Sequence, residues 1–251
     1  MPFIQAYAAV NPSVVTSSSY TSLFIRPSSS GQLQLIDAGY ANFAVDITFT
    51  AALRYCNWLH NGRNGNVSSF ESGAYTITPI VYIPGQGYSD TITRSDDARY
   101  WIPSVDEWVK AVYYDPNRYG QGVEGYWKYP YSSDTPPIPG VDTNAELSLL
   151  YLSAVATYAD AQTPWGLFDA SGGWAEWTDT RQPFTLRNNR LVLGSGIGGS
   201  VTIDDYLGTV GGLPGDISGP YGLRVATSVP SPSGIVVLLA AISQTARRRR
   251  R

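Results

Sequence analysis

The stretch PWGLFDASGGWAEWTD, residues 164–179, holds three of the chain's seven tryptophans among glycines and acidic residues. Trp165, Trp174 and Trp177 follow neither a helical nor a strand period, so the stretch is not a regular amphipathic element. Large aromatic side chains bury much apolar surface when a chain folds. We therefore predict that residues 164–179 form a tightly wound segment packed within the core of a folded domain.

A helix is predicted upstream, over residues 49–60. Ala52, Cys56 and Leu59 stand at positions i, i+4 and i+7, so they share one face of that helix. Its candidate caps are Thr48 or Thr50 at the start and Asn61-Gly62 at the end. Cys56 is predicted to be a small core residue, and His60 a surface or capping residue.

A second helix is predicted to begin after Ser104. Ser104 and Glu107 have the spacing of a capping box, in which each side chain accepts from the other residue's free backbone N–H. Trp108 and Val112 then share one face, and Asp115-Pro116 is predicted to end the helix. A short extended piece, residues 99–103, leads into it.

The remaining segments are predicted from β-branched, aromatic and turn residues. Strands are predicted over residues 74–83, 190–193 and 221–226, a weaker helix over 144–159, and loops over 28–31 and 116–142. Residues 194–219 hold nine glycines, and 194–199 are predicted to be a flexible glycine loop.

Four of these segments, in this order and spacing, are similar to motifs of a known family. They are YCNWL (55–59), IPSVDEW (102–108), GLFD with GGWAEW (166–169 and 172–177), and GLRVA (222–226). Together they resemble the formylglycine-generating enzyme (sulfatase-modifying factor) family over roughly residues 45–226. The resemblance implies an α+β fold of the C-type-lectin type, with two main helices, short strands and much irregular structure.

The family's oxidase chemistry is not expected in this chain. The resemblance implies a pair of late active-site cysteines that bind copper, but the only cysteine here is Cys56. Thiolate is the soft ligand that such copper chemistry requires. The single histidine, His60, also cannot build the site of the related iron-dependent enzymes. Copper is therefore not predicted.

The resemblance also implies a structural calcium ion, with Glu176 and Asp169 as candidate ligands. The amide position of the family's Gly-Asn-Val-Trp-Glu-Trp block is Gly173 here. Two interpretations remain for Glu176: a calcium ligand, or a buried acid that accepts from backbone N–H groups. For ligand binding, the candidate residues are Trp165, Trp174 and Trp177, as aromatic stacking platforms.

The charge distribution is uneven along the chain. There are 17 Lys and Arg against 20 Asp and Glu, and five of those 17 basic residues are Arg247–Arg251. The rest of the chain is acidic, which argues against a nucleic-acid partner because phosphate must be neutralised.

The C-terminal 25 residues resemble the PEP-CTERM sorting signal of Gram-negative bacteria. Val229, Pro230 and Pro232 stand at the Val-Pro-Glu-Pro-like motif, a short apolar segment follows, and Arg247, Arg248 and Arg249 belong to the terminal cluster. The resemblance implies transient membrane insertion, processing by an exosortase, and export to the cell surface or medium. The alternatives are a frayed basic tail and a helix packed on the domain.

The expected organisation is an N-terminal part (1–44), a formylglycine-generating-enzyme-like domain (45–226) and a sorting tail (227–251). Residues 1–15 lack the features of a secretory signal, so an exported protein is expected to have an in-frame extension upstream of Met1.

The leading functional hypothesis is an exported, non-catalytic domain that binds an extracellular polysaccharide or another surface ligand. The alternatives are an active sulfatase-modifying or related oxidase with a non-standard site, and a purely structural matrix protein.

Two further sequence patterns do not carry a functional prediction. The GxGxxG letters at 194–199 lack a following helix start. Carboxylate pairs for sugar hydrolysis could come from Asp106, Glu107, Asp169, Glu176 or Asp179.

Overall fold

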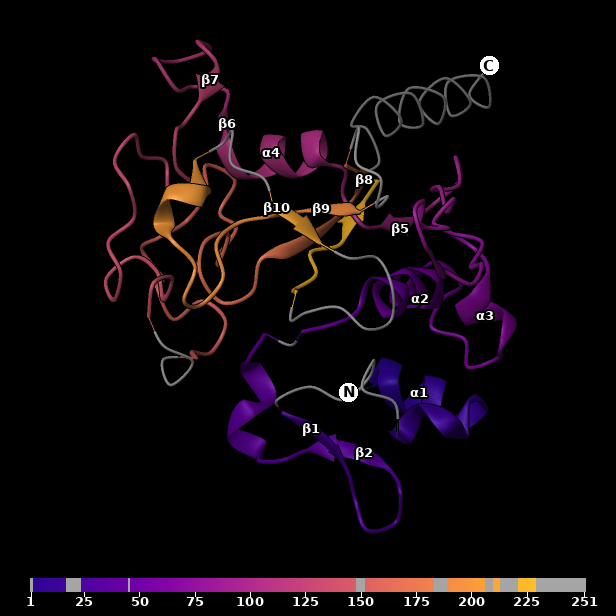
Figure 1. Cartoon of the computed structure of the whole chain (residues 1–251). Coiled ribbons are helices and arrows are strands. Elements are labelled where there is room, and N and C mark those ends of the chain that lie inside the picture. Colours follow the sequence, from indigo (N-terminus) through magenta and orange to yellow (C-terminus); the bar gives the residue numbers. More distant parts are fainter. Residues whose placement is uncertain are drawn as a thin grey trace, which may run out of the picture.

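The structure is a computed structural model, and it describes residues 2–16, 24–44, 46–147, 152–182, 189–205, 210–212 and 221–228 (Figure 1). The predicted sorting signal, with Val229, Pro230, Pro232, Arg247, Arg248 and Arg249, lies outside the described residues. None of the helices within the described ranges is both long and apolar enough to cross a bilayer.

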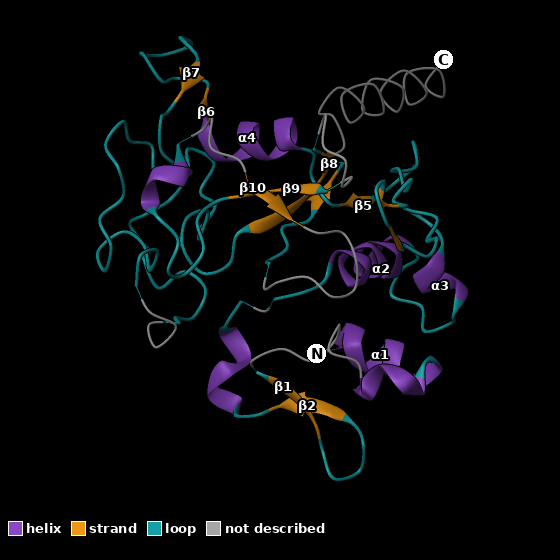
Figure 2. Cartoon of the chain, in the orientation of Figure 1, coloured by secondary structure: helices purple, strands orange, loops and turns teal. Residues whose placement is uncertain are grey.

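The chain folds as a mixed α+β protein with few helices, short strands and long irregular connections (Figure 2). The helices are α1 (Pro2–Val10), α2 (Phe49–His60), α3 (Ser68–Glu71) and α4 (Val105–Tyr113), with 3-10 turns at Pro12–Thr16, Ala38–Asn42 and Val201–Asp204. The strands are β1 (Ile25–Pro27), β2 (Leu33–Leu35), β3 (Tyr82–Ile83), β4 (Gly87–Tyr88), β5 (Tyr100–Trp101), β6 (Tyr114–Asp115), β7 (Gly125–Tyr126), β8 (Glu176–Arg181), β9 (Arg190–Leu193), β10 (Val210–Gly212) and β11 (Ala226–Thr227).

Helix α2 confirms the prediction for residues 49–60. The Thr48 hydroxyl accepts from the Ala51 N–H at its start, and Asn61 is the C-cap. Cys56 is fully buried, and burial raises the pKa of its thiol, so it behaves as an unreactive core residue. His60 ends the helix, where its Nδ1 accepts from the backbone N–H of Arg99 at 3.2 Å.

Helix α4 confirms the predicted capping box. The Ser104 hydroxyl accepts from the Glu107 N–H at 3.1 Å, and the Glu107 carboxylate accepts from the Ser104 N–H at 2.8 Å. The helix stops at Tyr113, before the predicted Asp115-Pro116, because Tyr114 turns to extended backbone. Tyr114 and Asp115 then pair with β7 as the two-residue strand β6.

A three-stranded antiparallel sheet, in the order β10-β9-β8, lies at the centre of the fold. Trp177 is opposite Val192 and Glu176 is opposite Leu193, so neighbouring residues of each strand point to opposite faces. Trp177 and Val192 belong to the core cluster of α2, whereas Leu193 belongs to that of α4. The two helices therefore cover opposite faces, with α4 drawn above the sheet in Figure 1.

The described residues upstream of 44 include α1, β1 and β2, which pack on α2 from the other side, as the lower part of Figure 1 shows. Phe3 and Tyr7 are buried on α1, four residues apart, in a second cluster with Trp58 and Phe70. The ring centroids of Phe3 and Trp58 are 5.8 Å apart. No helix was predicted over residues 2–10, because a stretch of nine residues gives only a weak periodic pattern of apolar side chains.

Three predicted elements are wrong in whole or in part. Of residues 74–83, only Tyr82–Ile83 form a strand, and Tyr75 makes an isolated bridge to Arg94. The described parts of 144–159 form turns and bridges in place of a helix. Residues 221–226 contribute only Ala226 to a strand. In each case, contacts between distant segments override the local preference for a regular element.

Candidate functional site

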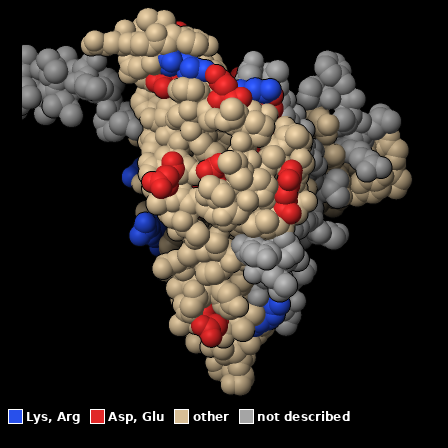
Figure 3. All heavy atoms as spheres, turned by 90° about the vertical axis from the view of Figure 1, so that its left-hand side faces the viewer, with Lys and Arg blue, Asp and Glu red and all other residues tan. Residues whose placement is uncertain are grey.

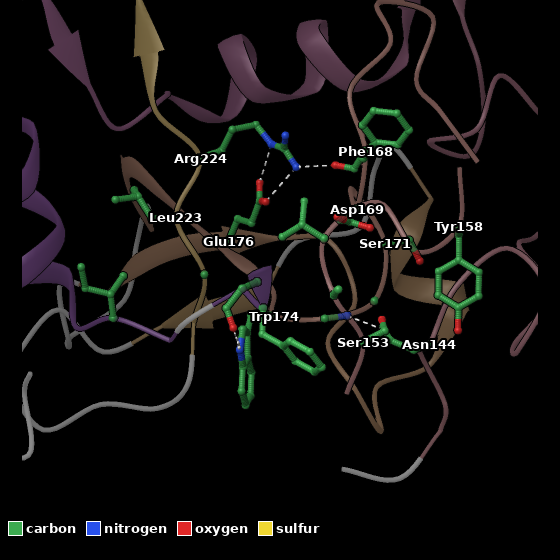
Figure 4. A pocket seen from close by; sticks show the side chains of 18 of the residues that line it. Asn144, Ser153, Tyr158, Phe168, Asp169, Ser171, Trp174, Glu176, Leu223 and Arg224 are labelled. Atoms are coloured by element: carbon green, nitrogen blue, oxygen red, sulfur yellow. Dashed lines mark hydrogen bonds and ion pairs between the residues drawn. The ribbon is translucent and has the colours of Figure 1, made fainter. Parts of the chain in front are cut away.

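A cavity of about 440 Å³ lies where four distant segments of the chain meet. The lining residues of these segments are 43, 44 and 47, then 144, 153–155 and 158, then 168, 169, 171–174 and 176, and finally 222–224. Phe3 and Ile4 of α1 and Tyr55 of α2 also line the cavity. In Figure 4, Glu176 and Arg224 lie on one side of the cavity, and Asn144, Ser153 and Tyr158 on the other. Its size is typical of a site for a small ligand or one unit of a larger one.

One wall is built on the ion pair of Glu176 and Arg224. The guanidinium donates to both carboxylate oxygens at 2.9 Å, and to the carbonyl of Phe168 at 3.0 Å. The indole Nε1 of Trp108, from α4, donates to Glu176 at 2.7 Å. The negative charge of Glu176 raises the pKa of Arg224. Both groups are thus held in fixed orientations by partners on other elements.

The prediction of calcium at Glu176 and Asp169 does not fit this geometry. Glu176 is the buried acid of the second interpretation, although its donors are side chains of Arg224 and Trp108 rather than backbone groups. Asp169 accepts from the Ala156 N–H at 2.8 Å. Within the described residues, no three acidic, histidine or cysteine side chains gather as a metal cluster. A guanidinium already supplies the positive charge that Glu176 requires.

The opposite wall is formed by Asn144 and a double-glycine turn. The Asn144 carbonyl oxygen accepts from the Gly173 N–H at 2.5 Å, and its amide donates to Ser153 at 3.2 Å. Gly172 and Gly173 have φ angles of +78° and +65°, in the region that favours glycine. The turn therefore brings its backbone against Asn144 in a way that other residues would resist.

A buried polar cluster supports this turn from below. Asp204 is fully buried and accepts from the Ser195 N–H at 2.6 Å, the Ser195 hydroxyl at 2.8 Å, and the Ser171 hydroxyl. Ser195 in turn accepts from the Gly172 N–H at 3.2 Å. Ser171 and Gly172 also line the cavity. Asp204 therefore acts as a positioning residue for the glycine turn in the cavity wall.

Asp204 makes stability depend on pH. Burial raises the pKa of its carboxyl from 3.8 to about 6. The folded state therefore binds this proton more tightly than the unfolded state, and stability falls as pH rises from about 4 to about 6. We expect Asp204→Asn, which mimics the protonated acid, to remove this decline in urea unfolding at pH 4, 5, 6 and 7. A difference between the two proteins that stays constant with pH would contradict the assignment.

The three candidate tryptophans occupy different environments. Trp177 is fully buried and its Nε1 donates to the Ile47 carbonyl at 2.8 Å, so its ring is closed to a ligand. Trp174 is 8% exposed, donates to the Ala44 carbonyl and lines the cavity. Trp165 is 55% exposed, away from the cavity, and stacks near Tyr114. The prediction of an exposed stacking platform is therefore wrong for Trp177. Trp174 is also buried, although it lines the cavity.

Several cavity residues were missed by the sequence analysis. The aromatic residues Phe43, Tyr55, Tyr158 and Phe168 line the cavity. Phe168 and Tyr55 lie inside the family-like motifs, so the motifs could have indicated these two as site residues. Phe43 and Tyr158 stand in segments without regular period, and no local pattern marks them.

The five carboxylates considered for sugar hydrolysis do not form a free catalytic pair. Some lie outside the cavity, and the others are hydrogen-bonded within the fold. Glu107 accepts from Arg94 at 2.9 Å and from the Trp101 Nε1 at 3.1 Å, besides its capping bond. Asp179 is largely buried, which raises its pKa, and Tyr75 donates to it. Only Asp169 and Glu176 of the five line the cavity. At residues 194–199, the glycine loop leads into a four-residue 3-10 turn, not into a dinucleotide-binding helix.

On the face shown in Figure 3, blue and red groups lie side by side near the top, and the charged groups below them are scattered over a largely uncharged surface. On that face the basic groups form no continuous patch of the kind that phosphate backbones require.

Comparison with known proteins shows similarity in structure only. No family model matches the chain, and no curated protein matches its sequence. The structure of CarF is similar at a TM-score of 0.50 and 18% identity, covering 74% of this chain and 68% of that one. The Treponema denticola variable protein 1 has a TM-score of 0.48 and 14% identity, covering 73% and 70%. At such identities the likeness to CarF bears on the fold alone, as a related mixed α+β arrangement.

Proposed function

We propose that this chain is an exported, non-catalytic binding domain of the formylglycine-generating-enzyme type, with a C-type-lectin-like fold. Its ligand is a surface or extracellular polysaccharide, bound one unit at a time in the cavity lined by residues 43, 44, 47, 144, 153–155, 158, 168, 169, 171–174, 176 and 222–224. The C-terminal segment directs processing by an exosortase and release or attachment at the cell surface.

The convergence of three of the four family-like motifs supports the proposed fold. Glu176, Arg224 and Trp108 come from three different motifs and meet in one hydrogen-bonded group. Asn57, from the remaining motif, is fully buried, donates to the Phe70 and Tyr75 carbonyls, and accepts from the Tyr75 N–H. Motifs that resemble a family by chance would have no reason to share buried polar contacts.

The inventory of side chains favours binding over oxidase chemistry. Oxidation through copper needs two accessible thiolates, and the one cysteine of these 251 residues is buried in α2 with a raised pKa. No thiol lines the cavity. Its polar groups are instead a neutral amide, hydroxyls, the paired Glu176 and Arg224, and the carboxylate of Asp169, which suit recognition of hydroxyl groups.

The observation that carries the proposal is the mixed lining of the cavity. The aromatic residues Phe43, Tyr55, Tyr158 and Phe168 line it together with Asn144 and Ser153. A sugar ring presents apolar C–H faces that stack on aromatic rings, and hydroxyls at its edges that hydrogen-bond to amides. Residues of both kinds line one cavity.

We expect the purified full chain to bind at least one polymer from a panel of dextran, polygalacturonate and dextran sulfate. Tyr158→Ala removes a half-buried ring that makes no side-chain hydrogen bond in the described structure, so its effect on folding is small. Loss of one aromatic contact of about 1 kcal/mol weakens binding about fivefold. Isothermal titration or immobilised-polymer binding measures the difference.

Two exposed aromatic residues outside the cavity serve as controls. Tyr119→Ala removes a ring that is 67% exposed, and Trp165→Ala removes the predicted platform that is 55% exposed. Neither variant should alter affinity. A loss of affinity with Trp165→Ala but not with Tyr158→Ala would place binding on the outer aromatic face, formed by residues 114–126 and Trp165. Turnover of a sulfatase-type cysteine peptide would overturn the non-catalytic assignment.

A further inference from the structure

A second cavity, of about 450 Å³, adjoins the first and is lined by two arginines. Arg63 follows the end of α2 and Arg99 precedes β5; Val225 and Thr227 supply part of the remaining wall. The cavity also contains the ring of Tyr55, which lines the first cavity as well. The two spaces are therefore neighbours that share one side chain.

Neither arginine is neutralised within the described part of the chain. The ion pairs found there engage Arg54, Arg94, Arg118, Lys128, Arg190 and Arg224. Arg63 and Arg99 have no carboxylate within 4.0 Å among the described residues. In a chain with more acidic than basic residues, Arg63 and Arg99 thus line one cavity without an acidic partner in the ranges that the structure describes.

Local contacts hold both arginines at this cavity. The Arg63 backbone N–H donates to the Trp58 carbonyl at 2.7 Å, in a left-handed conformation with φ +64°, and its guanidinium lies 5.8 Å from the Trp58 ring centroid. One N–H of the Arg99 guanidinium donates to the His60 carbonyl at 3.4 Å. No other hydrogen bond within the described structure engages either guanidinium, so most of their donors remain available to a ligand. Tyr55 and Tyr100 line the same cavity, where burial raises the pKa of the Tyr55 phenol and the charge of Arg63 acts against that larger effect.

We propose that this second cavity is a subsite for an anionic substituent, a carboxylate or a sulfate, of the polysaccharide bound in the first cavity. Guanidiniums bind such oxygen pairs through parallel charge-assisted hydrogen bonds. The inference rests on the proposed function and narrows it: the ligand is an acidic polysaccharide, with one unit against the aromatic wall and a charged group between Arg63 and Arg99.

The test compares Arg63→Gln/Arg99→Gln with a control pair, Arg26→Gln/Lys110→Gln. The control removes the same charge from exposed residues that line neither cavity. All proteins, the reference chain included, are full length with Arg247–Arg251 replaced by glutamine, because that basic cluster attracts any polyanion. The probes are polygalacturonate for carboxylate, dextran sulfate for sulfate, and uncharged dextran.

We expect the double variant to bind the preferred acidic polymer about tenfold more weakly, which corresponds to about 1.4 kcal/mol. Its affinity for dextran and the affinities of the control pair should not change. The acidic polymer that shows the larger loss identifies the charged group. Unfolding midpoints of the variants check that each protein is folded.

Two other outcomes separate the claims. If acidic polymer binds, and Tyr158→Ala weakens it but the arginine variant does not, the anionic subsite is wrong and the proposed function stands. If none of the three polymers binds, both the proposed function and the subsite are overturned.

Discussion

Gly172→Ala is expected to lower the free energy of unfolding by about 3 kcal/mol and to abolish most ligand binding. The added Cβ would fall on the Oδ1 atom of Asn144, at 2.5 Å from the Thr143 Oγ1 and 3.0 Å from the Asn144 backbone N. A φ of +78° adds the strain of a left-handed backbone. To make room, Asn144 must leave its place in the cavity wall. Urea unfolding and polymer binding measure the two effects.

The neighbouring glycine provides a matched control. Gly173 has a φ of +65°, but a Cβ there would meet no atom within 4 Å. Gly173→Ala should therefore cost only the backbone strain, about 1 kcal/mol of the free energy of unfolding, so it is a control for stability. Equal losses in the two variants would show that the steric contact at Gly172 plays no part.

Asp90→Ala is expected to lower the free energy of unfolding by about 3–5 kcal/mol. Asp90 accepts from Arg190, whose side chain is 3% exposed, and the carboxylate itself is fully buried. Arg190 also donates to the Ile92 carbonyl at 2.7 Å and lies over the Phe49 ring at 4.6 Å. Removal of the acid leaves a buried cation without a counter-charge beside β8 and β9. Urea unfolding at neutral pH measures the loss.

A more exposed ion pair calibrates that effect. Asp134 is 58% exposed and pairs with Arg118, whose side chain is 12% exposed. Asp134→Ala should cost about 1 kcal/mol, clearly less than Asp90→Ala, because solvent reaches the carboxylate and screens the pair from that side. If Asp90→Ala costs no more than Asp134→Ala, the Asp90–Arg190 pair is not a structural element of the core.

Local sequence signals predicted the elements whose stability is also local. The caps of α2, the Ser104–Glu107 capping box and strand β9 each depend on residues within a few positions of one another. The family-like motifs further indicated which helix and turn segments belong to one domain. These predictions needed no knowledge of how distant segments pack.

The candidate site depends on distant contacts and was only partly predictable. Glu176 and Arg224 are 48 positions apart, and Glu176 and Trp108 are 68 apart, so no local pattern shows that they meet. Trp177 and Trp165 have the same side chain within one short stretch, but strand pairing buries the first and leaves the second exposed. Residue type alone therefore could not separate a core tryptophan from a surface one.

Hydrogen exchange of the full chain, with and without a bound polymer from the panel, tests the central claim most directly. Binding in the first cavity predicts slower exchange at residues 168–176 and 222–224, which lie far apart in the sequence and line one space. Protection confined to residues 114–126 and 165, on the outer aromatic face, would contradict the cavity as the binding site.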